Sequence, residues 1–272
     1  GTMRGVSGNT NWNVLAGGDG GYVAVDTLND GSSVNDILFL ENTGYSIQKS
    51  TNGGTTFVDA INGIEGDPGS GGPLFITPFT MNLGTKSQLW TGGWSIYRTS
   101  NYATNWTRAT AANGTCGLGS VSAIAVHPLD GNRVMVGMTD GCVNYQTAAL
   151  STTNTSAWPS VVMSANRYIS WLAFDPVDVN VGYATVSAFG AANVYKTSNG
   201  GGTWTPIVGS GLTAIPQVPA RTIVVNPADT NQLFVGTDVG VFTSIDGGLN
   251  WYRENTGFAN VSVFSLKISE SV

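Results

Sequence analysis

The chain has 272 residues, of which 41% are hydrophobic, only 10% are charged and 37 are glycine. This length is enough to bury a large core without stabilising crosslinks. The net charge is −6, and the eleven Lys and Arg residues are scattered singly, so we expect neither nucleic-acid binding nor membrane insertion. One histidine and two cysteines are too few for a His/Cys metal site, and we expect no metal and no cofactor.

An aromatic residue that closes a turn rich in Ser, Thr, Asn and Gly recurs every 45 to 52 residues. The six positions are Trp12, Phe57, Trp106, Trp158, Trp204 and Trp251. A box of the form Ser/Thr-x-Asn/Asp-Gly-Gly precedes three of them, with its third residue at Asn52, Asn199 and Asp246. Such a side chain can bond N–H groups of its own turn while glycine takes positive φ, so we assign these three residues a structural role.

A proline-bearing turn forms a second repeat and begins at His127, Asp175 and Asn226. Each copy joins two short runs rich in Val, Ile, Phe and Tyr, and none of these runs has a helical period. Each repeat therefore predicts four antiparallel strands, and such units at this period are typical of β-propeller blades. The predicted fold is all-β, a single propeller with five complete blades at residues 21–64, 75–111, 121–163, 168–208 and 220–257.

The two ends of the chain predict a partial sixth blade, with strands three and four in residues 1–15 and an inner first strand in residues 261–269. The chain is then either a ring closed by this mixed blade or a fragment of a longer propeller with seven or eight blades. The fragment is favoured because an open second-strand position leaves backbone groups unpaired. That position also offers a route to self-association by strand addition.

The boxes that end at Phe57, Trp204 and Trp251 resemble those of the Asp-box, or BNR-repeat, propellers. This superfamily includes sialidases, sortilin-type receptors and xyloglucanases. The resemblance covers nearly the whole chain and implies that the boxes lie between strands three and four, away from the functional face.

Function is expected on the opposite face, where loops join strand four to the next strand one and strand two to strand three. Carboxylates beside aromatic rings in such loops suit sugar binding. The candidate ligand-binding residues there are Glu41, Tyr45, Asp67, Trp94, Arg167, Phe189 and Arg221.

Glycoside cleavage requires two carboxyl groups, one as acid and one as base or nucleophile. The stretch from Thr237 to Val241 is similar to the Thr-Asp-x-Gly-Gly motif of xyloglucanases, which implies a catalytic role for Asp238. Its partner would come from sequence outside this chain, or would be Asp19 or Asp140. Those enzymes place their carboxylates between two propellers, whereas this chain holds at most one. A sialidase is disfavoured, because the seven arginines are spread out and the early Arg-Ile-Pro element is absent.

Cys116 and Cys142 would close a loop of 26 residues as a disulfide in an oxidising compartment, and otherwise are two buried thiols. Low charge with abundant Ser, Thr, Asn and Gly is typical of secreted bacterial surface proteins, so we expect an extracellular or cell-surface location. We expect a non-catalytic module that binds a glycan or a protein on its loop face. The alternatives are a xyloglucanase-like glycoside hydrolase fragment and a structural surface module.

Overall fold

The computed structural model consists of antiparallel strands, with two short 3₁₀ helices among the described residues. It describes residues 1–5, 11–28, 32–64, 72–111, 116, 119–254, 256–257 and 260–268. In this part of the chain no helix has the length and apolar character needed to cross a membrane. The chain divides into two compact units, Gly1–Gly114 with Thr152–Ser156, and Thr115–Ser151 with Ala157–Val272.

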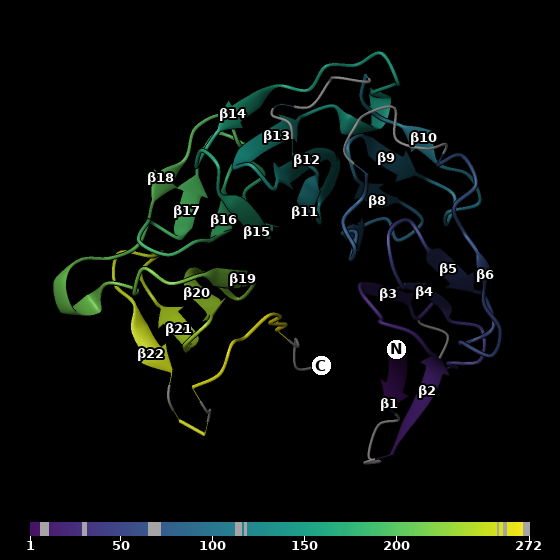
Figure 1. Cartoon of the computed structure of the whole chain (residues 1–272), viewed down its shortest axis with the longest axis horizontal. Coiled ribbons are helices and arrows are strands. Elements are labelled where there is room, and N and C mark those ends of the chain that lie inside the picture. The colour runs from purple at the N-terminus through teal and green to yellow at the C-terminus, as the bar shows by residue number, and fades with distance from the viewer. Residues whose placement is uncertain are drawn as a thin grey trace. The chain divides into compact units, whose positions relative to one another are not determined.

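The first unit contains one two-stranded sheet and two four-stranded sheets (Figure 1). The two-stranded sheet pairs β1 (Thr2–Gly5) with β2 (Trp12–Ala16). The first complete sheet has the order β3 (Val23–Asp26), β4 (Ile37–Glu41), β5 (Ile47–Ser50) and β6 (Val58–Asp59). The second has the order β7 (Phe79–Met81), β8 (Leu89–Gly92), β9 (Ile96–Thr99) and β10 (Thr107–Arg108).

The second unit contains three four-stranded sheets of the same order. They are formed by β11 (Val121–His127), β12 (Asp130–Met138), β13 (Cys142–Gln146) and β14 (Ser160–Val162); by β15 (Tyr168–Phe174), β16 (Gly182–Ser187), β17 (Val194–Thr197) and β18 (Thr205–Pro206); and by β19 (Ala220–Asn226), β20 (Asp229–Thr237), β21 (Gly240–Ser244) and β22 (Tyr252–Glu254). The 3₁₀ helices are η1 (Ala149–Ser151) and η2 (Gly211–Thr213).

The prediction of an all-β chain with five four-stranded antiparallel sheets is confirmed, and each sheet lies inside one of the five predicted ranges. β1 and β2 form the predicted two strands of an incomplete sheet. Residues 261–268 form no strand, although the Val263 N–H donates to the Thr237 carbonyl at 3.0 Å. The prediction that both chain ends share one sheet stays a prediction, and Ser269 lies outside the described residues.

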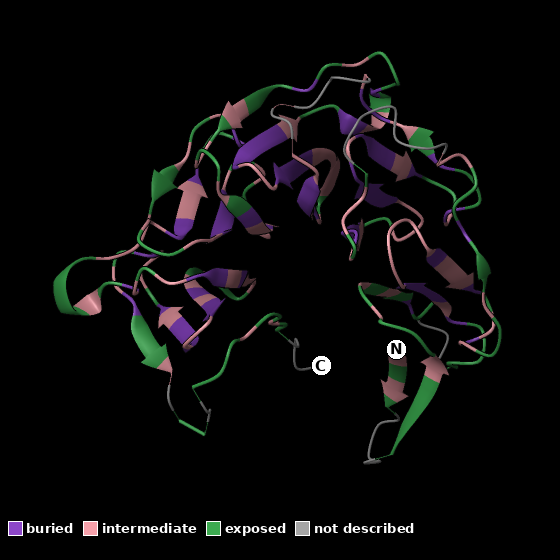
Figure 2. Ribbon diagram, viewed as in Figure 1, coloured by how far each residue is buried: buried purple, intermediate pink, exposed green. Residues whose placement is uncertain are grey.

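The core of each unit lies between the faces of consecutive sheets. Figure 2 shows burial concentrated in the second and third strands of the four-stranded sheets, whereas the fourth strands are more exposed. Apolar residues fill the spaces between sheets in three clusters, which include Phe39 with Phe79, Met135 with Leu172, and Tyr183 with Ile223. Strands that are covered on both faces, such as β4 and the second half of β12, have nearly continuous apolar sequences rather than alternating ones.

The boxes fold into one hydrogen-bonded turn that recurs in four sheets. In the β21–β22 turn, Ser244 Oγ donates to Asp246 Oδ1 (2.7 Å) and accepts the Gly248 N–H (2.9 Å). Asp246 Oδ1 also accepts the Asn250 N–H (2.9 Å), and Gly248 has a φ of +95°, which favours glycine. Equivalent bonds link Ser50 with Asn52, Thr99 with Asn101, and Thr197 with Asn199. The side-chain oxygens therefore accept hydrogen bonds within their own turns at Asn52, Asn199 and Asp246.

Removing the box hydroxyl is expected to destabilise its sheet. Ser244 is fully buried, so Ser244→Ala leaves the Gly248 N–H without its partner and should lower the free energy of unfolding by about 2 kcal/mol. Thr243→Val is the matched control, because the neighbouring Thr243 Oγ1 is buried without a hydrogen-bond partner. Urea unfolding of both variants tests this, and equal losses would contradict it.

Candidate functional site

Three loops of the second unit meet on one side of its sheets. The Asp140 carbonyl, in the β12–β13 turn, accepts the Asn166 N–H from the β14–β15 loop at 2.8 Å. Arg167, in the same loop, donates from Nη1 to the carbonyl of Phe189 in the β16–β17 loop at 3.3 Å. The structure therefore brings three of the predicted site residues into linked loops.

Arg221 and Asp238 form a bidentate ion pair beside these loops. Arg221 Nε donates to Asp238 Oδ1 at 2.7 Å, and Nη2 donates to Oδ2 at 2.9 Å. Arg221 Nη1 also donates to Ser187 Oγ at 2.8 Å. The pKa of Asp238 is lowered, mainly by the hydrogen bonds from Arg221, so this carboxyl is ionised at neutral pH. The ionised Asp238 has no proton to donate, and both of its oxygens accept hydrogen bonds from Arg221.

The motif around Asp238 is explained by its turn. Thr237 Oγ1 donates to the Gly240 carbonyl at 2.8 Å and accepts the Val239 N–H at 3.1 Å. These bonds close the tight β20–β21 hairpin, and Gly240 takes a φ of +111°. Thr237 and Gly240 of the sequence pattern are thus explained by the geometry of this hairpin. A catalytic role for Asp238 stays a prediction.

One exposed aromatic ring packs against Arg221, and a second belongs to the loop that follows Ser187. Phe189 is 69% exposed, and Phe264 is 66% exposed with its ring centroid 5.1 Å from the Arg221 Cζ. Tyr168 is partly exposed and lies within electrostatic reach of Arg221. We name the set the Arg221 surface, which comprises Arg167, Tyr168, Phe189, Arg221, Asp238 and Phe264. The sequence does not predict Tyr168 and Phe264 as members of this surface, because nothing in the repeats marks them as neighbours of an arginine.

The third catalytic candidate, Asp140, holds backbone together. Its Oδ2 accepts the Gly119 N–H at 3.1 Å and its Oδ1 accepts the Cys142 N–H at 3.3 Å. Cys142 forms a disulfide with Cys116, with their Cα atoms 6.1 Å apart. The carboxylate and the disulfide together tie the segment before β11 to the start of β13.

The first unit holds the other predicted site residues. Asp19 is exposed, and its N–H donates to Asn42 Oδ1 at 3.1 Å. Tyr45 makes an edge contact with Tyr97, at 5.9 Å between ring centroids. Trp94 is half-buried, and Asp67 lies outside the described residues.

Glu41, also in the first unit, is fully buried at the end of β4. Its Oε1 accepts the Thr77 N–H at 3.1 Å and its Oε2 accepts the Tyr22 N–H at 3.2 Å. Burial raises the pKa of Glu41 to about 7, although the two N–H bonds act in the other direction. A ligand could reach this carboxyl only after the bonds to Thr77 and Tyr22 opened.

Metal binding receives no support from the clustering of side chains. Among the residues that the structure describes, no group of three or more His, Cys, Asp or Glu side chains is placed to hold an ion.

Five four-stranded antiparallel sheets, packed face to face within each unit, define a β-propeller in which each sheet is a blade. No protein-family model matches the sequence, and no curated protein matches it as a relative. Solved propellers match the fold. An ancestral GH74 enzyme has a TM-score of 0.66 and 17% identity over 91% of this chain and 32% of the enzyme.

Two further matches are structures of YCF48. The protein from Cyanidioschyzon merolae has a TM-score of 0.59 and 17% identity, covering 92% of this chain and 73% of its own. YCF48 bound to D1 peptide has a TM-score of 0.50 and 15% identity, covering 80% and 63%. At these identities the likeness shows the fold alone. This chain spans only about a third of the GH74 enzyme.

Proposed function

We propose that this propeller is a non-catalytic module that binds a glycan or a protein through the Arg221 surface. The observation that carries the proposal is the bidentate Arg221–Asp238 pair, which occupies the carboxylate best matched to hydrolase chemistry. The exposed ring of Phe264 packs against Arg221, and the exposed Phe189 follows Ser187, which accepts a hydrogen bond from Arg221, by two residues. A neutralised polar centre with aromatic neighbours suits recognition of a ligand rather than proton transfer.

Two finer proposals accompany this one. The recurrence of one hydrogen-bonded turn in four sheets supports membership of the Asp-box superfamily. The disulfide between Cys116 and Cys142 supports an extracellular or cell-surface location, because such bonds persist in oxidising compartments.

Binding is tested by probing arrays of immobilised glycans and immobilised peptides with the purified chain and with Phe189→Ala. Loss of the exposed ring should weaken binding about tenfold, as expected when one large apolar side chain no longer becomes buried. Leu129→Ala is the matched control, because Leu129 is 75% exposed in the β11–β12 turn. Absence of binding on both arrays, or equal effects of the two variants, would reject the proposal and favour a structural surface module.

The hydrolase alternative is favoured by one observation, the fold likeness to a GH74 enzyme. A reducing-end assay on a polysaccharide panel distinguishes the two functions. We expect no release of reducing ends by the unmodified chain. Release that Asp238→Asn or Asp19→Asn abolishes would show a glycoside hydrolase and overturn the binding proposal.

A further inference from the structure

The Arg221 surface contains one arginine that has no acidic partner. Arg167 donates from Nη1 to the Phe189 carbonyl at 3.3 Å, and no carboxylate of the described residues lies within 4.0 Å of its guanidinium group. Its Nε and Nη2, which make no hydrogen bond in the described part of the chain, are the same two atoms with which Arg221 holds Asp238. Arg167 therefore presents the edge of its guanidinium group that binds a carboxylate bidentately.

Both arginines of this surface are anchored on one short stretch of chain. Arg167 bonds the Phe189 carbonyl, and Arg221 Nη1 bonds Ser187 Oγ at 2.8 Å. Two residues of extended chain span about 7 Å, so these anchor points are close together. Tyr168, which follows Arg167, pairs with Ser187 across β15 and β16. Two arginines and one aspartate give this small area a net charge of +1, although the whole chain carries −6.

Phe189 adds an open aromatic ring to the same area. The ring is 69% exposed, and its neighbours in the loop are small, namely Ala188, Gly190, Ala191 and Ala192. A methyl group on Gly190 would contact no atom within 4 Å outside the adjacent residues. A flat ligand ring can therefore lie against Phe189 without displacing a neighbouring side chain, and the apolar face of a pyranose suits such a contact.

The ion pair favours a sugar over an acidic peptide as the ligand. Arg221 and Asp238 are both partly exposed, so they present hydrogen-bond donors and acceptors side by side. Sugar hydroxyls both donate and accept hydrogen bonds and can use both partners. A run of acidic side chains could pair with Arg167 but would also meet the negative charge of Asp238.

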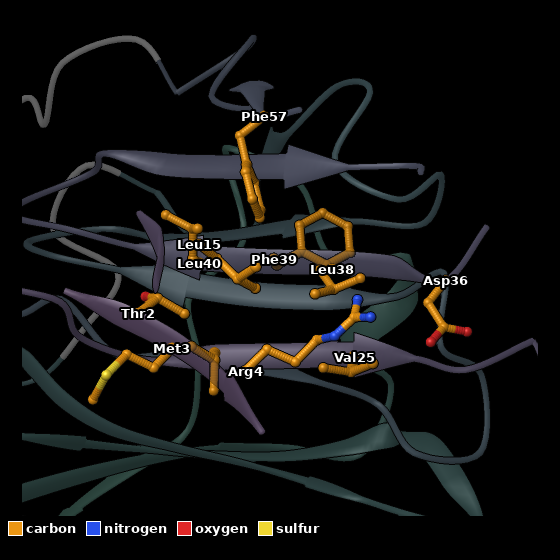
Figure 3. A pocket seen from close by; sticks show the side chains of 11 residues that line it. Thr2, Met3, Arg4, Leu15, Val25, Asp36, Leu38, Phe39, Leu40 and Phe57 are labelled. Carbon is orange, nitrogen blue, oxygen red and sulfur yellow. The ribbon is translucent and has the colours of Figure 1, made fainter. Parts of the chain in front are cut away.

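The cavity in the first unit does not suit an anionic ligand. Figure 3 shows this cavity, of about 220 Å³, between β1–β2 and the β3–β6 sheet, with a lining that is mostly apolar, as at Leu15, Leu38 and Leu40. None of the predicted ligand-binding residues lines it. A carboxylate would lose its hydration against this lining and would meet the charge of Asp36.

We propose that the Arg221 surface binds a glycan whose sugar rings carry carboxylate groups. This inference rests on the proposed function and names the class of its ligand. A carboxylate of the glycan pairs bidentately with Nε and Nη2 of Arg167, and a sugar ring stacks on Phe189. The Arg221–Asp238 pair stays intact and bonds the sugar hydroxyls.

The probe is a fluorescently labelled oligomer of galacturonic acid, and its methyl ester is the neutral control with the same sugar rings. Titration of the purified chain should give saturable binding that is about tenfold tighter for the acid than for the ester. The affinity for the acid should fall as salt is added, whereas the affinity for the ester should not, because only the acid pairs with a charge.

Three variants locate the carboxylate. Arg167→Gln removes the charge and should weaken binding of the acid about tenfold while changing the affinity for the ester less than about twofold. Lys196→Gln is the matched control, because Lys196 is a cation of the same unit that lies over the Tyr183 ring, 5.5 Å from its centroid, and beside the β21–β22 turn. It should leave both affinities unchanged. Phe189→Ala should weaken the acid and the ester alike.

Two results would overturn this inference and leave the proposed function standing. One is equal affinity for acid and ester, or equal losses in Arg167→Gln and Lys196→Gln, while Phe189→Ala still weakens binding. The other is tighter binding of a labelled polyglutamate peptide than of the galacturonic acid oligomer, because the ligand would then be an acidic peptide. Absence of binding to these probes and to both arrays would reject the proposed function as well.

Discussion

Replacement of Trp251 by alanine is expected to lower the free energy of unfolding of the second unit by about 4 kcal/mol. The ring is 2% exposed and packs in the cluster that contains Ile223 and Leu233. Its Nε1 donates to the Ile207 carbonyl, after β18, at 2.7 Å. The substitution therefore creates a cavity between two sheets and removes the donor of a hydrogen bond that joins them.

Trp204 provides the matched comparison in the same unit. This ring closes an equivalent box, but it is half-buried, and its Nε1 donates to the Gly201 carbonyl inside its own turn at 3.0 Å. Trp204→Ala should therefore cost less than half as much as Trp251→Ala. Urea unfolding followed by circular dichroism measures both, and equal midpoints for the two variants would contradict the prediction.

The fold could be predicted from the sequence because its repeats carry local chemistry. Each box contains its own donors and acceptors, so Ser244, Asp246 and Asn250 specify a turn whatever surrounds them. Turns at a regular spacing then fix the number of strands between them. The contrast between Trp204 and Trp251 could not be predicted in this way, because it depends on which neighbouring sheet covers each ring.

The candidate site was only partly predictable, because its contacts join residues from different turns. Arg221 and Asp238 were both candidates, but their pairing joins the start of β19 to the β20–β21 turn, 17 residues further along the chain. Glu41 was predicted as a loop-face carboxylate, and its burial depends on the segment that brings Thr77 over it. The sequence identifies which polar side chains are present, whereas the packing of strands and loops determines which of them form hydrogen bonds with one another.

Glu41 makes the stability of the first unit depend on pH. Burial raises its pKa from 4.5 to about 7, so between these values the folded protein keeps a proton that the unfolded chain releases. The free energy of unfolding should therefore fall as the pH rises from about 4.5 to about 7, by up to about 3 kcal/mol from this group. Asp238 and Asp246 have lowered pKa values, so their contributions change below this window.

Glu41→Gln is expected to remove this slope, because an amide of the same shape does not ionise. Urea unfolding of the unmodified chain and the variant at pH 5 and pH 8 isolates the contribution of Glu41, since other groups act equally in both proteins. One of these is His127, whose pKa is lowered by burial, so its effect on stability has the opposite sign. Glu254→Gln, which removes a charge from a half-exposed carboxyl, is the control and should keep the slope. An unchanged slope in Glu41→Gln would show that Glu41 stays ionised in the folded protein, with the Thr77 and Tyr22 N–H groups outweighing the cost of its burial.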